Sequence, residues 1–279
     1  MPDTVAAPVA AVPPEALTQR RVTREGALPW ITTPIVLIAL ISIWEFYVLQ
    51  FRVSPLILPR PGAVLDAWIE MLQSPRAWHH TWMTVYATLT GFAYAVVIGV
   101  GLGVIIARVR WLELTLNPFI VATQVIPKVA LVPLFVLWFG FGIVSKVIVA
   151  AVLAFFPILT NTAMGVKSID EGHRDVMLSL NATRWQVFRR LEFPSALPFI
   201  LTGFEIGIVL AIIGAIVGEY LGGNAGLGHL LIARLNAFET ADMFAVLIHM
   251  SILGFLFYFS IGALRKILIP WHASARLKV

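Results

Sequence analysis

Long apolar runs separated by short polar segments dominate the hydrophobic pattern of the chain. A helix rises about 1.5 Å per residue and the bilayer hydrocarbon is about 30 Å thick, so a spanning helix needs about 20 mostly apolar residues. Runs of that length lie at 29–51, 82–107, 115–138, 144–166, 197–220 and 244–269. The third and fourth runs are divided only around Gly140-Phe-Gly142. The pattern therefore predicts an all-α, polytopic membrane protein with about six transmembrane helices, or five if those two runs are not separate.

The composition supports a membrane protein. Of 279 residues, 59% are hydrophobic and 13% are charged, and the mean hydropathy is +0.89. Soluble domains carry about 25% charged residues, so this chain lacks the polar residues to cover a water-facing surface. The absence of cysteine excludes disulfides, thiolate metal sites and cysteine nucleophiles. The six histidines show no metal-ligand spacing, so no metal site is expected.

The distribution of basic residues predicts the orientation. If the N-terminus is cytoplasmic, most arginines and lysines fall on the cytoplasmic side, in the segments 20–24, 108–110, 167–190 and 265–278. This bias places both termini in the cytoplasm. It also explains the net charge of +5 without a nucleic-acid partner.

The chain divides into a tail and a membrane domain. Residues 1–28 are rich in proline and alanine and are expected to form a flexible cytoplasmic N-terminal tail. The transmembrane domain then covers 29–279, with one long cytoplasmic loop at 167–196.

Ionisable residues inside the apolar runs are candidates for a translocation path. A charge at the bilayer centre costs about 2.5–3.5 kcal/mol, so each needs a partner, a wet cavity or a place near the surface. Lys128, Glu205 and Glu219 are the path candidates. For Lys128 and Glu205 the alternative is structural pairing with another span. For Glu219 it is a position near a span end that reaches the interface.

The fifth run carries a stripe of small residues at helical spacing. Its members are Gly203, Gly207, Ala211, Gly214 and Gly218. Such stripes let helix backbones approach closely in a bilayer, so the stripe is expected to form helix-packing or subunit-interface contacts. On a helical wheel, the side roughly opposite this stripe holds Glu205, Ile208, Ile212 and Glu219. This arrangement predicts a central helix with one packing face and one carboxylate-bearing face.

The 167–196 loop reads as two short helices. Asp170 is a candidate N-cap of the first, and Asn181 suits the left-handed position where it ends. Thr183 with Gln186 forms a candidate capping box for the second, which Pro194 is expected to close. Such a pair is either a docking element or lies on the lipid headgroups.

The segment from Asp175 to Pro194 resembles the cytoplasmic EAA loop, E-A-A-x3-G-x9-I-x-L-P, of binding-protein-dependent ABC importer permeases. The spacing is kept, with Asp for Glu, Val-Met for Ala-Ala and Asn181 for Gly. Ile126-Pro-Lys128, Phe155-Phe-Pro157 and Gly226-Leu-Gly228 look like the nitrate/sulfonate/taurine branch. Gly214–Glu219 and Ile269-Pro-Trp271 look similar to members linked to pyrimidine thiamine-precursor or riboflavin uptake.

The resemblance implies a type I ABC importer permease fold in the bacterial inner membrane. The implied partners are an ABC ATPase dimer, a second permease copy (most simply a homodimer), and a periplasmic or lipid-anchored solute-binding protein, all in a lipid bilayer. The ATPase-coupling loop would include Asp175, Val176, Met177, Leu178, Ser179, Leu180, Asn181, Ala182, Thr183 and Pro194. This chain has no G-x-x-x-x-G-K-[ST] loop, so it is not expected to be an enzyme or to hold a cofactor, and ATP and magnesium belong to the partner.

Two other classes compete with this interpretation. A secondary transporter or channel would need no ATPase, but the hydropathy shows no convincing inverted repeat. A membrane enzyme would need a catalytic or metal-ligand spacing that the histidines lack. The solute stays open between sulfonate, taurine or nitrate and a pyrimidine- or riboflavin-type vitamin precursor.

Overall fold

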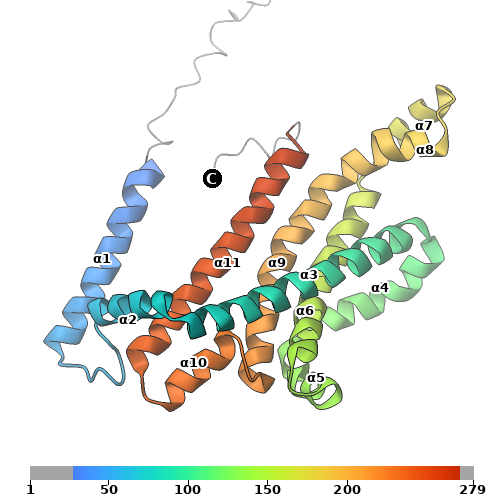
Figure 1. Ribbon diagram of the computed structural model, residues 1–279. Coiled ribbons are helices and arrows are strands. Elements are labelled where there is room, and N and C mark those ends of the chain that lie inside the picture. Colours follow the sequence, from blue (N-terminus) through green and yellow to red (C-terminus); the bar gives the residue numbers. More distant parts are fainter. Residues whose placement is uncertain (1–27, 271–279) are drawn as a thin grey trace, which may run out of the picture. The chain divides into compact units, whose positions relative to one another are not determined.

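The computed structural model describes residues 28–270, and the regular structure of this part of the chain is helical (Figure 1). Residues 271–279 and the predicted tail lie outside the described residues, except for the last tail residue, Leu28, which begins the first helix. The helices are α1 (Leu28–Gln50), α2 (Pro61–Gln73), α3 (Pro75–Arg108), α4 (Arg110–Val125), η3 (Lys128–Leu131), α5 (Val132–Phe139), α6 (Ile143–Lys167), α7 (Glu171–Ser179), α8 (Arg184–Val187), η4 (Phe188–Glu192), α9 (Phe193–Gly222), α10 (Leu227–Asn236) and α11 (Thr240–Leu268).

Five of the described helices are long and apolar enough to cross a membrane. They are α1, α3, α6, the continuous run from α8 to α9, and α11. The predicted third span is not one straight helix. It consists of α4 followed by η3 and α5, bent by 85° at the break next to Pro127, and counts as a sixth span if the pair crosses together. Proline has no N–H to donate and its ring disfavours a continuing helix, which explains the break.

The chain forms two compact units, and α1 belongs to the first, which ends at Ser54. The second unit, from Pro55 onward, contains the remaining helices and is centred on α3, α6 and α9, which lie side by side (Figure 1).

Small residues of α3 and α9 allow both helices to pack closely against α6. At Ala150 of α6, added methyl groups on Gly91 of α3 and Gly214 of α9 would lie only 2.6 Å and 2.8 Å from its atoms. About two helical turns away on each helix, Gly99 and Gly207 meet Ile158 in the same way. The predicted stripe of the fifth span therefore lies against α6, which a second stripe on α3 also meets, and buried alanines of all three helices pack together. Close backbone approach maximises van der Waals contact where lipid provides no hydrophobic drive.

The helix after the capping box does not end at Pro194 as predicted. The turn η4 is a π-helix, in which the Phe193 N–H bonds to the carbonyl of Phe188, and α9 follows without interruption. A π turn relaxes the tight i→i−4 ladder just before Pro194, where the missing N–H and the ring would otherwise break an α-helix. The loop and the fifth span therefore form one continuous helical run.

Two short helices were not predicted. α2 packs against α11, and α10 packs against α9 and α11. Leu227 and Leu230 of α10 join Val246 and Met250 of α11 in a small buried cluster. This cluster anchors the turn between α9 and α10.

Candidate functional site

A pocket of about 530 Å³ opens where the third span is broken. It lies between the α4–η3 break, α6 and α9, and its lining includes Gln124, Lys128, Phe156, Asn161, Ile206 and Leu210. The Lys128 ammonium lies 5.0 Å from the centre of the Phe156 ring, within the range of a cation–π contact. Pockets for small ligands typically measure about 300–1,000 Å³ and are mostly apolar with a few polar groups, as this one is.

Polar side chains enter this pocket where Pro157 interrupts the hydrogen-bond ladder of α6. The Asn161 amide donates to the Pro157 carbonyl at 2.9 Å, and the Thr160 hydroxyl donates to the Phe156 carbonyl at 2.9 Å. Pro157 has no N–H to donate to the Leu153 carbonyl, and these two side-chain bonds go to other carbonyls, each one turn before the donating residue, so they hold the Asn161 and Thr160 side chains against α6. The result is a wall with amide, hydroxyl, ammonium and aromatic groups on one side of the pocket.

Glu205 is paired with another helix. One of its carboxylate oxygens accepts a hydrogen bond from Arg265 of α11 at 2.9 Å, and the two side chains are 12% and 23% exposed. Glu205 does not line the pocket that contains Lys128. Arg265 therefore gives Glu205 the structural pairing with another span that was the alternative to a place in the translocation path.

Glu219 lies in a buried polar cluster. Its side chain is 1% exposed, so the expectation that it reaches the interface is wrong. The carboxylate accepts hydrogen bonds from the Thr84 hydroxyl at 2.8 Å and from the Gly228 N–H at 2.9 Å. Lys146, 0% exposed, interacts with the same carboxylate electrostatically and donates to the Ala225 carbonyl at 2.6 Å. The structure therefore does not bring Lys128, Glu205 and Glu219 together at one site.

The open face of α9 is apolar and does not carry the carboxylates. Ile206, Ile213 and Tyr220 are 45%, 41% and 48% exposed and follow one another at seven-residue spacing. Ile208 and Ile212, placed with the carboxylates on the predicted second face, are buried. The predicted two-faced pattern is corrected accordingly: α9 is packed through both of those faces, and an apolar stripe between them is left open.

Local capping builds the two helices between α6 and α9. The Asp170 carboxylate accepts from the Gly172 N–H at 2.7 Å, and Asn181 has a φ of 54° at the end of α7. The N–H groups of Asn181 and Ala182 bond to the carbonyls of Leu178 and Met177, which completes a Schellman motif. Thr183 and Gln186 form the capping box. The predicted caps of this segment are confirmed.

The turn between α7 and α8 displays apolar side chains. Val176, Leu178 and Leu180 are 59%, 53% and 73% exposed. Asp175, Ser179, Asn181 and Thr183 are also exposed, Met177, Ala182 and Pro194 are half-buried, and Pro194 lies in the first turn of α9. An exposed apolar tip between polar flanks indicates a contact surface.

Comparison with known proteins decides the family. Residues 99–273 match the model of the binding-protein-dependent transport system inner membrane component. The chain belongs to this family. It is 37% identical over 246 residues to the riboflavin transport system permease protein of Chloroflexus aurantiacus, covering 88% of this chain and 92% of that protein. It is 38% identical over 233 residues to the formylaminopyrimidine transport permease protein of Halalkalibacterium halodurans, covering 84% and 92%.

The fold agrees with a solved importer. Inward-facing structures of the MetNI methionine ABC transporter include a chain that matches this permease with a TM-score of 0.57 at 20% identity, over 70% of this chain and 98% of that one. The permease is thus a multi-pass, all-helical transport subunit with a type I ABC importer fold, as predicted.

Several residues of the permease's polar cluster were missed by sequence reasoning. Lys146 lies at the start of the apolar run 144–166, and Thr84 belongs to no motif. His80, also in this cluster, accepts a hydrogen bond from the Gly226 N–H at 3.0 Å. The sequence offered one signal for this cluster: Lys146 lies within an apolar run and close to the glycines at 140 and 142. Within residues 28–270, no group of His, Asp and Glu side chains is arranged to hold a metal ion.

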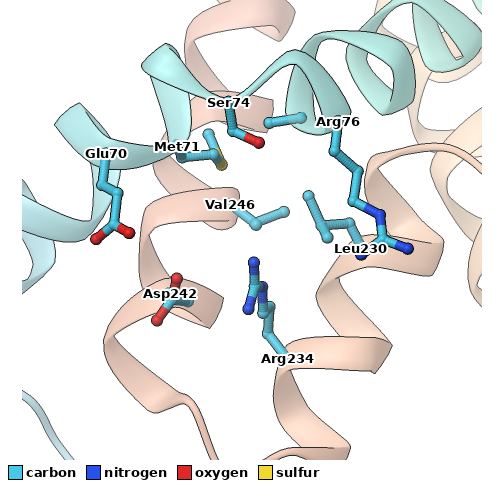
Figure 2. Close-up of a pocket in the computed structure, with 9 residues that line it drawn as sticks. Glu70, Met71, Ser74, Arg76, Leu230, Arg234, Asp242 and Val246 are labelled. Carbon is cyan, nitrogen blue, oxygen red and sulfur yellow. The ribbon is translucent and has the colours of Figure 1, made fainter.

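A small charged pocket lies between α2, the start of α3, α10 and α11 of the permease. Its volume is about 110 Å³, and Glu70, Arg76, Arg234 and Asp242 are among its lining residues (Figure 2). A hydrogen-bonded ion pair with Glu239 raises the pKa of Arg234 above its ordinary value. Basic and acidic residues thus share this pocket, which lies at the end of the bundle away from the α7–α8 tip (Figure 1).

Proposed function

We propose that this permease forms the solute path of an ATP-driven importer of a bacterial inner membrane, with both termini and the 167–196 segment on the cytoplasmic side. The excess of arginine and lysine in the segments assigned to the cytoplasm supports this orientation. The family match and the importer fold support the transport role.

One observation carries the proposed coupling to an ATPase: the exposed apolar tip formed by Val176, Leu178 and Leu180. The caps on both sides hold this tip rigidly, and a rigid apolar projection in water is costly unless a partner covers it. A dimer of ATPase subunits is the proposed partner. Those subunits would bind ATP and magnesium, since the permease sequence has no phosphate-binding loop of its own.

A second copy of the permease is proposed to complete the path. The Lys128 pocket and the apolar stripe of Ile206 and Ile213 open on neighbouring parts of α9. A two-fold axis beside α9 would bury the stripe against its own copy and enclose two such pockets. A periplasmic or lipid-anchored binding protein would deliver the solute from outside, with membrane lipid around the remaining surface.

The coupling is tested by placing a charge on the tip. Leu180→Asp is expected to remove the ATPase from the purified permease and to abolish uptake, because the carboxylate would have to be buried in the contact. Phe238→Asp, equally exposed at 74% in the α10–α11 turn, is the matched control and should retain the ATPase. Normal uptake by Leu180→Asp would instead favour a secondary transporter, which was the alternative.

The proposed solute is a heteroaromatic vitamin precursor of the pyrimidine or riboflavin type. The Lys128 ammonium and the Asn161 and Gln124 amides offer hydrogen bonds to ring carbonyls and nitrogens, and Leu210 and Phe156 offer apolar and aromatic contact. The two relatives that are 37% and 38% identical carry riboflavin and formylaminopyrimidine in their names. Sulfonate, taurine and nitrate are the alternative, because a lysine also suits an anion.

Uptake assays separate these solutes. Cells that lack their own transporters and express the complete system would be given labelled riboflavin, formylaminopyrimidine or taurine in turn. Uptake of one of the two heteroaromatic compounds is expected to depend on the permease, and Lys128→Gln is expected to reduce it. Permease-dependent uptake of taurine alone would overturn the assignment.

A further inference from the structure

Glu192 joins three elements at the base of the α7–α8 tip. Its Oε2 accepts a hydrogen bond from Arg108, the last residue of α3, at 2.5 Å, and its Oε1 accepts one from Arg174 of α7 at 2.8 Å. Glu192 itself is the last residue of the π turn η4. We refer to these three residues as the Glu192 clasp.

Burial makes the clasp more than a surface ion pair. The Glu192 side chain is 15% exposed, whereas the two arginines are 49% and 45% exposed. Exposed pairs contribute about 0–1 kcal/mol, but a half-buried carboxylate with both oxygens in charge-assisted hydrogen bonds is held more strongly. The Arg108 guanidinium also lies 5.6 Å from the centre of the Phe188 ring. This contact limits the directions in which the clasp can move.

The π turn determines where Glu192 lies. One residue more than in an α-helical turn is accommodated between Phe188 and Phe193, which rotates Glu192 relative to the register of α9. π turns occur mostly where a particular side-chain placement is needed. Leu178 of α7 and Val187 of α8 line the same pocket as the clasp residues, so the clasp and the tip form one structural unit.

We propose that Glu192 is a positioning residue that fixes the orientation of the tip on α3, so that movement of the tip is transmitted to α3 as well as to α6 and α9. This inference rests on the proposed coupling to an ATPase. The chain itself connects the tip to α6, which precedes it, and to α9, which follows it. The clasp adds a link to α3, which packs against both of them.

A cysteine reporter tests whether the clasp holds the tip. The chain has no natural cysteine, and Val187 is 6% exposed beside the clasp. In Val187→Cys permease in inverted membrane vesicles, adding Glu192→Gln is expected to speed modification by a membrane-impermeant maleimide about tenfold, within the range for residues in one ionic network. Glu171→Gln removes the same charge from an exposed site in α7 and should not change the rate.

ATP hydrolysis by the purified complex tests the coupling role. The Glu192→Gln permease is expected to keep its ATPase subunits, because the docking tip is intact. Its rate of ATP hydrolysis in the presence of the binding protein is expected to fall about tenfold. Glu192→Asp should recover part of that loss. The double variant Arg108→Gln/Arg174→Gln should match Glu192→Gln, and combining all three should cost nothing further, because the three residues form one network.

The outcomes separate this inference from the proposed function. Unchanged maleimide modification in Glu192→Gln, or unchanged stimulated hydrolysis with the ATPase retained, would overturn the clasp while leaving the importer intact. Additive losses from the arginine and glutamate variants would overturn it too. If the wild-type permease itself retained no ATPase, the proposed function would fail and the coupling role with it.

Discussion

Glu219 illustrates how much a single buried carboxylate contributes to the stability of this permease. Glu219→Ala removes an acceptor from the Thr84 hydroxyl and from the Gly228 N–H, and it removes the negative charge near buried Lys146. Buried donors left without partners cost about 1–3 kcal/mol each, and an unpaired buried charge costs more. We expect a loss of about 3–5 kcal/mol of stability, measured as a lower unfolding temperature in detergent.

Glu239 provides the matched control for this prediction. It is also a paired carboxylate, with Arg234 as its partner, but its side chain is 44% exposed. Exposed ion pairs contribute about 0–1 kcal/mol, so Glu239→Ala should shift the unfolding temperature little. Equal shifts for the two variants would show that the Glu219 cluster is not a stabilising network.

At the scale of the elements, local chemistry was predictable and long-range placement was not. The spans that became α3, α6, α9 and α11 follow from apolar length, and the caps around α7 and α8 follow from a few neighbouring residues. The 85° break next to Pro127 did not follow, because a proline in a span is compatible with a kink or with a full break. The helices α2 and α10 fall below the length that identifies a span, so their amphipathic patterns gave no comparable signal.

The candidate site was predictable residue by residue but not as an assembly. A lysine or glutamate in an apolar run draws attention because its burial is costly. Which partner relieves that cost depends on tertiary contacts: Glu205 meets Arg265 from sixty positions further along the chain, and Glu219 meets Thr84 from 135 positions earlier. The same limit applies to η4, where a π turn carries the helix through Pro194 and places Glu192 between two arginines.

At the scale of the whole molecule, the apolar stripe on α9 is the feature that a single copy leaves unexplained. Ile206 and Ile213 are open beside the Lys128 pocket, although the other faces of α9 are packed. If this pocket opened to lipid, the Lys128 ammonium would be exposed to hydrocarbon at a high cost, whereas a two-fold partner would enclose the pocket with protein and solvent. The stripe therefore favours a homodimer whose axis runs beside α9.

Cysteine cross-linking tests this arrangement directly, because the natural chain has no cysteine. Residues near a two-fold axis meet their own copies, so Ile213→Cys is expected to form a disulfide-linked dimer on mild oxidation in membranes. Phe255→Cys, on α11 and 62% exposed, is the control and should stay monomeric on a denaturing gel. Dimers from Phe255→Cys alone would move the interface to α11, and the Lys128 pocket would then lie away from the axis and could not belong to a shared path.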